Sequence, residues 1–267
     1  MENINICIVI PAYNEERRIG KTLEEYCKFF TEKKKNKEIL DFKILIVINN
    51  TTDRTEYIIK SFQKRYKELS YLNFKQGGKG FAIREGFKHA LTKNFELIGF
   101  VDGDLATSPS SFYDLVLNMK NNDGTIASRY VRGSVVIPSA TFRRIVVSRI
   151  FNLLTRTLLF LPYKDTQCGA KLFKRGTLEK IIDKLNMSRW AFDVDLLYHT
   201  KKMGFRIKEI KTYWVDKEYS KINFWAAGPM MGLAIIRLRL LNSPLKSIVG
   251  TYDKIVNIIN KKIKTTK

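Results

Sequence analysis

The chain has 267 residues, 45% of them hydrophobic, so it can bury a core as one large domain or as one domain with a small C-terminal appendage. Its 48 Lys and Arg residues against 26 Asp and Glu give a formal charge of +22, which predicts an anionic partner: nucleic acid, a phospholipid surface or a phosphorylated substrate. Only two histidines argue against a His-ligated metal or a Ser-His-Asp triad, and three cysteines without a Cys-x-x-Cys pair predict reduced thiols.

Apolar, strand-like runs alternate with helix-like stretches over the first 130 residues. The strand-like runs are residues 4–10, 42–48, 71–74, 96–101 and 125–127. The helix-like stretches are residues 15–34, 53–68, 80–92 and 109–121. This alternation predicts an α/β fold with a mostly parallel central sheet flanked by helices. Ligands of such sheets bind outside the carboxyl ends of the strands.

Polar turns follow the first two strand-like runs. The first run leads into Pro11, Tyr13 and Glu15, where a ring and acidic groups could cradle a base and a ribose. The second leads into a polar turn that begins at Asn49, and a later loop places Lys79 between two glycines. Glycines allow close backbone approach, and the helix that follows directs its amide end at a ligand. The same residues also suit ordinary helix starts.

Asp102 and Asp104 follow the strand-like run 96–101 directly and are separated by Gly103. An Asp-x-Asp pair at a strand end can hold Mg²⁺ or Mn²⁺ by oxygen, while the other positions of the ion bind a diphosphate. The alternative is an acidic strand-to-helix turn without an ion, in which a serine caps the next helix. Together with the preceding turns, the pair favours a nucleotide diphosphate with its metal.

The pattern changes after residue 130 to longer helices at 141–161, 175–185 and 191–203, followed by a strand-like run at 206–214. The apolar segments 150–163 and 224–236 are bordered by arginine and are shorter than a membrane-spanning helix requires. They suit either an interfacial position on a membrane or packing on the core. The N-terminus shows no secretory signal.

Several motifs resemble those of the family 2 glycosyltransferases with the GT-A (nucleotide-diphospho-sugar transferase) fold. In chain order they are residues 8–15, 78–80, 102–104 and 128–131. Two later motifs, at residues 165–173 and 189–198, resemble one branch, the dolichyl-phosphate β-glucosyltransferases, which are close relatives of the dolichyl-phosphate mannose synthases. The similarity extends over about residues 4–240.

The resemblance implies a set of residues that bind the nucleotide sugar. They are Pro11, Tyr13, Glu15, Val47, Asn49, Lys79, Asp102, Gly103, Asp104, Arg129, Arg143 and Lys221. Within this set, Asp102 and Asp104 would hold Mg²⁺ or Mn²⁺, and Arg129 would reach the donor or acceptor phosphate. Relatives usually carry Asp-Asp where this chain has Ile48-Asn49, which leaves the choice of base open.

The expected activity is inverting transfer of a hexose, with glucose from UDP-glucose favoured, onto a dolichyl or polyprenyl phosphate. A phosphate monoester has a second pKa of about 6, so it is already an anionic nucleophile near neutral pH. A sugar hydroxyl acceptor would need a carboxylate base, for which Asp165, Asp193 and Asp195 are the contenders and Asp165 or Asp195 is favoured. Asp193 and Asp195 cannot both face the site if they lie on a helix. The expected catalytic set is therefore Asp165, Asp195 and Arg129.

Residues 1–222 are expected to form the GT-A domain, and residues 223–267 to form C-terminal amphipathic, basic helices at an anionic membrane surface. The expected location is peripheral, on the cytoplasmic side of a membrane. The alternatives are a GDP-mannose or UDP-N-acetylhexosamine donor, a polysaccharide acceptor, a non-enzymatic basic scaffold at a membrane, and a basic nucleic-acid-binding protein. Against the last stands the absence of a nucleic-acid recognition motif.

Overall fold

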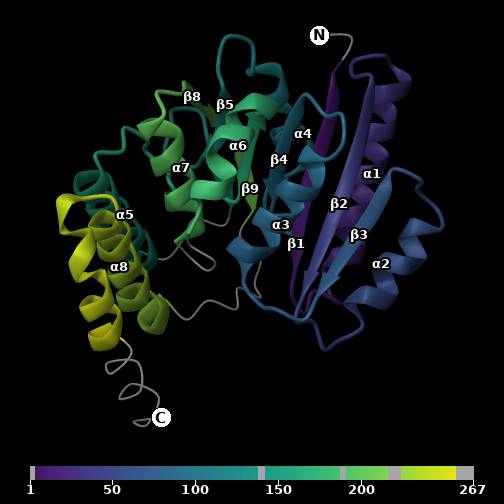
Figure 1. Cartoon of the computed structure of the whole chain (residues 1–267). Coiled ribbons are helices and arrows are strands. Elements are labelled where there is room, and N and C mark those ends of the chain that lie inside the picture. The colour runs from purple at the N-terminus through teal and green to yellow at the C-terminus, as the bar shows by residue number, and fades with distance from the viewer. Residues whose placement is uncertain (1–3, 138–141, 187–190, 216–223, 257–267) are drawn as a thin grey trace.

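The computed structural model describes residues 4–137, 142–186, 191–215 and 224–256, and within these ranges it does not describe the side chains of 142–147 and 224–230. Figure 1 shows a central sheet with helices packed around it. In the described ranges the strands are β1 (Asn5–Ala12), β2 (Asp41–Asn49), β3 (Leu69–Phe74), β4 (Leu97–Val101), β5 (Gly124–Ser128), β6 (Val135–Ile137), β7 (Ala170–Lys174), β8 (Ile207–Lys211) and β9 (Tyr213–Val215).

Within the described ranges, seven strands form one sheet in the order β3-β2-β1-β4-β7-β5-β8. Neighbouring strands run parallel except at β7, which is antiparallel to both β4 and β5. β6 and β9 pair in parallel as a small second sheet. Because β1, β2 and β4 are parallel, their carboxyl ends meet at one edge of the main sheet.

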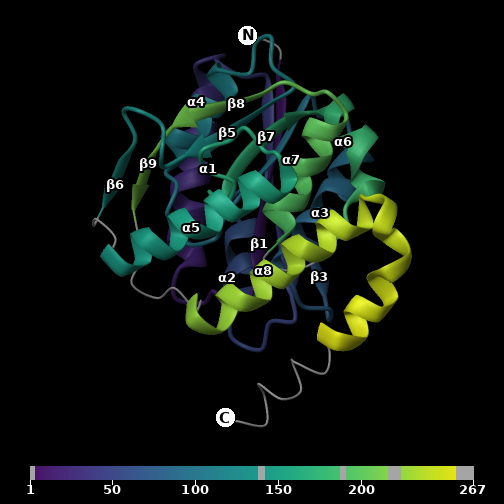
Figure 2. The same ribbon diagram turned by 90° about the vertical axis from the view of Figure 1, so that its left-hand side faces the viewer.

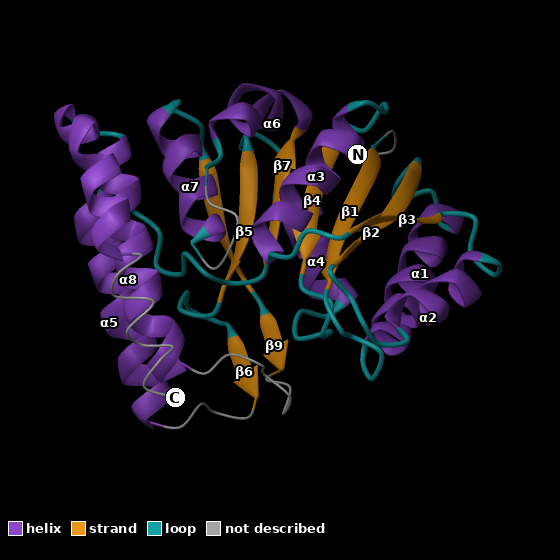
Figure 3. Ribbon diagram, turned by 60° about the horizontal axis from the view of Figure 1, so that its bottom comes forward, coloured by secondary structure: helices purple, strands orange, loops and turns teal. Residues whose placement is uncertain are grey.

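Helices cover both faces of the sheet, as Figure 3 shows. They are α1 (Ile19–Lys35), α2 (Thr55–Gln63), α3 (Lys79–Leu91), α4 (Pro109–Leu117), α5 (Phe142–Leu159), α6 (Arg175–Ile181), α7 (Phe192–Lys202) and α8 (Phe224–Leu241), with short 3₁₀ helices η1 (Ile182–Lys184) and η2 (Pro244–Ile248). Successive side chains of β1 point to opposite faces of the sheet, so the core has two parts. Ile8 belongs to the part under α1, α2 and α4, and Val9 belongs to the part under α3, α6 and α7.

Helices α5 and α8 lie side by side at the β8 end of the molecule (Figures 1 and 2). Ile235 and Leu238 of α8 are fully buried in a third apolar cluster, together with Leu159 of α5 and Leu197 of α7. The second half of α8 is therefore packed against the rest of the molecule. No helix in the described part of the chain is both long and apolar enough to cross a bilayer.

The predicted α/β alternation and mostly parallel sheet are confirmed, with three differences. β7 was not predicted as a strand, and neither was β6. The predicted strand 206–214 is divided between β8 and β9, which belong to different sheets. The division falls at Thr212, whose backbone N–H and C=O bond to Ser134 Oγ and Val135 N instead of continuing the main ladder.

Candidate active site

The turns after β1 and β2 hold each other in place at the carboxyl edge. Asn14 N donates to Thr51 Oγ1 (3.2 Å), and Asn14 Oδ1 accepts from Thr52 N (2.8 Å). Asn14 and Asn50 have φ angles of 51° and 53°, a left-handed conformation that asparagine tolerates better than most residues. These contacts leave the neighbouring ring of Tyr13 46% exposed at the edge.

The acidic turn after β4 lies beside them. Thr22 Oγ1 donates to Gly103 O (2.9 Å), and Ala106 N donates to Asp104 Oδ1 (3.0 Å). Leu105, directly after the acidic pair, has a φ of 58°, an uncommon conformation for a bulky residue. Such strain is typical of turns whose side-chain direction serves a function.

Asp102 is held against the start of β7. Its N–H donates to Gly169 O (2.9 Å), and a Cβ at position 169 would lie only 2.0 Å from Asp102 Oδ2. Only glycine therefore allows the carboxylate of Asp102 to take this position.

A chain of charges runs from Asp102 into the interior. Lys79 Nζ lies 2.7 Å from Asp102 Oδ1 and 3.5 Å from Asp193 Oδ2. Asp193 Oδ1 in turn accepts from Nζ of Lys171 (2.6 Å), which is fully buried and also donates to Cys168 O (2.7 Å). Both ammonium groups lie over the ring of Phe100, at 5.6 and 5.4 Å from its centroid.

These charges shift one another's pKa values. Burial raises the pKa of Asp102, and the carboxylates of Asp104 and Asp193 add to the rise while Lys79 opposes it. Burial would lower the pKa of Lys79, but Asp102 and Asp193 outweigh it and raise that pKa. Lys79 is thus a fixed cation beside the acidic pair, where it neutralises part of their charge.

A second cation approaches Asp104 from α1. Arg18 donates to both carboxylate oxygens of Glu15, at 2.7 Å each, and its Nη1 lies 4.0 Å from Asp104 Oδ2. Glu15 N donates to Thr55 Oγ1 (2.7 Å), so the start of α2 also fixes this turn. The acidic pair therefore lies between Lys79 on one side and Arg18 on the other.

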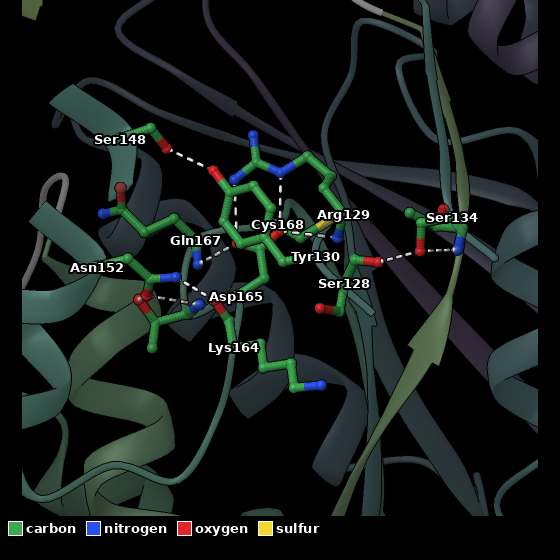
Figure 4. Close-up of polar contacts among 12 residues, drawn as sticks. Ser128, Arg129, Tyr130, Ser134, Ser148, Asn152, Lys164, Asp165, Gln167 and Cys168 are labelled. Carbon is green, nitrogen blue, oxygen red and sulfur yellow. Dashed lines mark hydrogen bonds and ion pairs between the residues drawn. The ribbon is translucent and has the colours of Figure 1, made fainter. Parts of the chain in front are cut away.

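Arg129 and Asp165 form a separate, buried ion pair (Figure 4). Arg129 Nε donates to Asp165 Oδ2 (2.7 Å) and Nη2 donates to Oδ1 (3.0 Å). The same carboxylate accepts from the backbone N–H of Arg129 (2.9 Å) and of Gln167 (3.2 Å). Burial alone would raise the pKa of Asp165, but Arg129 outweighs it and lowers that pKa below the usual value.

The remaining sequence-predicted residues lie in different places. Val47 is fully buried in the core beneath α3. Asn49 is 3% exposed, and its amide ties two turns together by donating to Ala12 O (2.8 Å) and accepting from Gly78 N (3.0 Å). The side chain of Arg143 and the whole of Lys221 lie outside the described residues.

Asp195 lies on α7 away from the acidic cluster. It is fully buried, its Oδ2 accepts from Asn186 N (2.7 Å), and its Oδ1 lies 3.3 Å from His199 Nε2. Asp193, two residues earlier, is the α7 residue that reaches the cluster, as the expected helical spacing allows for only one of the two. Sequence reasoning gave no role to Lys171. It named Asp193 as a contender for the base but favoured Asp165 or Asp195.

No group of three or more His, Cys, Asp or Glu side chains in the described ranges is arranged to hold a metal ion by itself. Asp102 and Asp104 are two oxygen-bearing groups at the sheet edge, and hard divalent cations prefer such ligands. An ion here would need further oxygens from a ligand or from water.

The model of the family described as "Glycosyl transferase family 2" matches residues 7–182. Among curated relatives, the dolichyl-phosphate beta-glucosyltransferase of Dictyostelium discoideum is 30% identical over 248 residues, which cover 90% of this chain and 75% of the relative. The relative of the same name from Saccharomyces cerevisiae is 31% identical over 262 residues, covering 90% and 76%. The one from Homo sapiens is 30% identical over 248 residues, covering 88% and 76%.

Solved structures share the architecture at low identity. Glucosyl-3-phosphoglycerate synthase from Mycobacterium tuberculosis, in complex with Mn²⁺, UDP and glucosyl-3-phosphoglycerate, gives a TM-score of 0.63 at 16% identity over 89% of this chain and 79% of that chain. S. aureus TarS in complex with UDP-GlcNAc gives a TM-score of 0.55 at 16% identity, over 91% of this chain and 68% of that chain. At these identities the likeness concerns the fold.

Proposed function

Since the chain belongs to glycosyl transferase family 2, we propose that it transfers glucose from UDP-glucose to the phosphate of dolichol or another polyprenol. The predicted GT-A fold is confirmed, and membership of the family makes the chain a glycosyltransferase. The main support for the sugar and the acceptor is the identity of 30% over 90% of the chain with a dolichyl-phosphate beta-glucosyltransferase.

The donor is proposed to bind at the carboxyl edge of β1, β2 and β4. The exposed ring of Tyr13 offers a face for the base, and the turn at Glu15 lies beside the acidic pair. Two solved neighbours with this fold hold UDP or UDP-GlcNAc, which supports a uridine nucleotide, and ligands of such sheets bind outside the carboxyl ends of the strands. Val47 is buried in the core, so its side chain supports the site from below.

Asp102 and Asp104 fit a divalent cation, because each carries carboxylate oxygens at the open edge and the two repel each other without one. Mg²⁺ or Mn²⁺, when bound, would neutralise negative charge on the departing diphosphate. Lys79 supplies a further positive charge at the same place, next to Asp102. Ala106 N holds Asp104 Oδ1 at 3.0 Å, and Arg18 Nη1 adds a positive charge 4.0 Å from its Oδ2.

On the acceptor side, Arg129 is proposed to contact phosphate and Asp165 to position it. Asp165 faces Nε and Nη2 of Arg129, and Figure 4 shows the third guanidinium nitrogen pointing away from the carboxylate. A carboxylate with a lowered pKa and this many donors is a weak base. A lipid phosphate, with a second pKa of about 6, needs no base at neutral pH. The transfer is therefore proposed as a single displacement with inversion.

We also propose that α5 and the C-terminal helices meet an anionic membrane surface, on its cytoplasmic side. Ile150, Leu153 and Phe160 are 60–65% exposed, an unusual fraction for large apolar side chains so close together. Arg149 and Arg156 flank them on α5, which is typical of an interfacial helix. In this proposal residues 223–267 form an appendage to the catalytic domain of residues 1–222.

Vesicle flotation tests the membrane proposal. Ile150→Asp and Phe160→Asp should each reduce the fraction of protein that floats with vesicles containing phosphatidylserine. Leu40→Asp is the matched control, because Leu40 is 50% exposed and lies in the turn between α1 and β2, outside α5 and the C-terminal helices. Equal flotation of all three variants would contradict the proposed surface.

The activity is tested with purified protein, labelled UDP-glucose and a polyprenyl phosphate. We expect labelled lipid in the presence of Mg²⁺ or Mn²⁺, and none from Asp104→Ala. GDP-mannose and UDP-N-acetylglucosamine, supplied in parallel, decide between donors, and a polysaccharide supplied in place of the lipid decides between acceptors. Transfer to the polysaccharide alone, or full activity of Asp104→Ala, would overturn the proposed function.

A further inference from the structure

A polar cavity of about 420 Å³ opens beside α5, apart from the acidic turn. The residues that line it are Tyr130, Arg149, Asn152, Leu153, Arg156 and Lys164. Three of these six are cations, and none is acidic. A cavity with this lining attracts an anion.

The cations are brought together by the helix and by the segment that precedes β7. Arg149, Asn152 and Arg156 lie on one face of α5, at spacings of three and four residues. Asn152 fixes the other wall, because its Nδ2 donates to Lys164 O and its Oδ1 accepts from Thr166 Oγ1 (3.0 Å). The cavity thus lies between α5 and the segment before β7, which the bond from Asn152 to Lys164 ties together (Figure 4).

Within the described part of the chain, no charged side-chain nitrogen of the three cations has a carboxylate oxygen within 4.0 Å, although the backbone N–H of Lys164 donates to Glu209 Oε2 (2.8 Å). Arg156 Nε is buried and lacks a hydrogen-bond partner there, which is rare in a folded protein. Arg149 packs its guanidinium 4.1 Å from the ring centroid of Tyr130, whose hydroxyl bonds to Ser148 Oγ (2.6 Å). Within the described residues the guanidinium groups of Arg149 and Arg156 thus have no carboxylate to neutralise them, which favours an anion in the cavity.

The cavity shares its wall with the Arg129–Asp165 pair. Tyr130 follows Arg129 and Lys164 precedes Asp165 in the chain, and the Arg129 guanidinium lies 5.6 Å from the same Tyr130 ring. On its outer side the cavity meets Leu153, which is 60% exposed. It therefore connects an apolar surface with the groups proposed to act on the acceptor.

We propose that this cavity binds the phosphate monoester head group of the lipid acceptor, with the first isoprenoid units lying along Ile150 and Leu153. The inference rests on the proposed function and extends it, because Arg129 is engaged by Asp165 and cannot hold a dianion alone. The guanidinium charges of Arg149 and Arg156 match the two charges of a monoester better than the single charge of a phosphodiester.

Calorimetry with geranyl phosphate, a short isoprenyl monophosphate, tests the site without any transfer reaction. Arg149→Gln and Arg156→Gln should each weaken binding by about tenfold or more, since each removes charge-assisted hydrogen bonds. Arg156→Lys, which keeps the charge, should lose less. Lys35→Gln is the matched control, because this exposed lysine ends α1 on the far side of the molecule.

Binding of UDP with Mn²⁺ should be the same in every variant, which shows that the donor site is intact. Unchanged affinity of the two glutamine variants for geranyl phosphate would overturn the site. The site would also be overturned if the glutamine variants floated less with phosphatidylserine vesicles but kept their affinity for geranyl phosphate. The arginines would then bind the phospholipid surface and not the acceptor. Inorganic phosphate should bind more weakly than geranyl phosphate but show the same dependence on Arg149 and Arg156.

The two proposals fail separately. If the parent chain binds geranyl phosphate through these arginines but transfers no sugar to polyprenyl phosphate, the site stands and the proposed function fails. If transfer occurs and Arg149→Gln/Arg156→Gln has the parent KM for the lipid, the function stands and the site fails.

Discussion

Replacing Arg129 with methionine would leave the buried carboxylate of Asp165 without its charged partner. The Asp165 side chain is 1% exposed and that of Arg129 is 19% exposed, so the pair lies largely out of water. Removing one member of a buried pair costs about 3–5 kcal/mol. Asp165 would keep backbone hydrogen bonds at 2.9 and 3.2 Å. We therefore expect the free energy of unfolding to fall by the lower figure, about 3 kcal/mol.

This loss should depend on pH. In the parent chain the folded-state pKa of Asp165 is lowered, so its contribution to stability is present above the unfolded pKa of about 3.9 and is lost as the pH falls through the lowered value. In Arg129→Met burial acts without the guanidinium and raises that pKa, so the variant loses stability as the pH rises through the raised value. The difference between the two proteins should therefore be larger at neutral than at mildly acidic pH.

Urea titrations followed by tryptophan fluorescence, at about pH 4.5 and about pH 7.5, measure both effects. Arg129→Met/Asp165→Asn should recover most of the loss, because no buried charge remains. Lys28→Met, which breaks an exposed pair with Glu24 at 2.8 Å, is the surface control and should change the midpoint little. A loss below about 1 kcal/mol at neutral pH, or the same loss at both pH values, would refute the reasoning.

Two further predictions concern the acidic cluster. Gly169→Ala places a Cβ 2.0 Å from Asp102 Oδ2, so the carboxylate must move. Calorimetry should then show UDP binding with Mn²⁺ that is weaker by at least about tenfold. The circular dichroism spectrum should be unchanged. Gly176→Ala, whose Cβ would meet nothing within 4 Å, should bind as the parent chain does, and equal binding by both variants would contradict the contact. Asp193→Asn removes the counter-charge of fully buried Lys171 and should lower the free energy of unfolding by about 3 kcal/mol in urea, a loss that Asp193→Asn/Lys171→Met should largely restore. Failure of the double variant to recover stability would mean that the charge pair is not the cause.

The acidic turn could be predicted because the local pattern is sufficient there. A continuous apolar run marks β4, and Asp102 and Asp104 follow it within three residues. Parallel strands bring their carboxyl ends to one edge, so the turns at Tyr13 and Asn49 were also expected to lie nearby. The bonds from Asn14 to Thr51 and Thr52 show this proximity.

β7 could not be predicted, because its sequence contradicts a buried strand. Ala170–Lys174 carries a lysine at its second position and another at its end, and a charge is rarely buried without a partner. Lys171 is tolerated because Asp193 reaches it from α7, 22 residues later in the chain. A tertiary pairing of this kind leaves no local periodicity. The cavity beside α5 was missed for the same reason, since Lys164 joins Arg149 and Arg156 only in the folded chain.

The antiparallel direction of β7 brings the Arg129–Asp165 pair and the acidic turn to the same edge of the sheet. A parallel strand would begin at the opposite edge, whereas β7 begins opposite Val101, at the carboxyl end of β4. The residues that lead into it therefore cross the active edge: Asp165 orients Arg129, and Gly169 adjoins Asp102. Four peptide units separate these two positions, so their Cα atoms can be no more than about 14 Å apart. The distance between the Arg129–Asp165 pair and the acidic turn is thus limited by the covalent chain before any ligand binds.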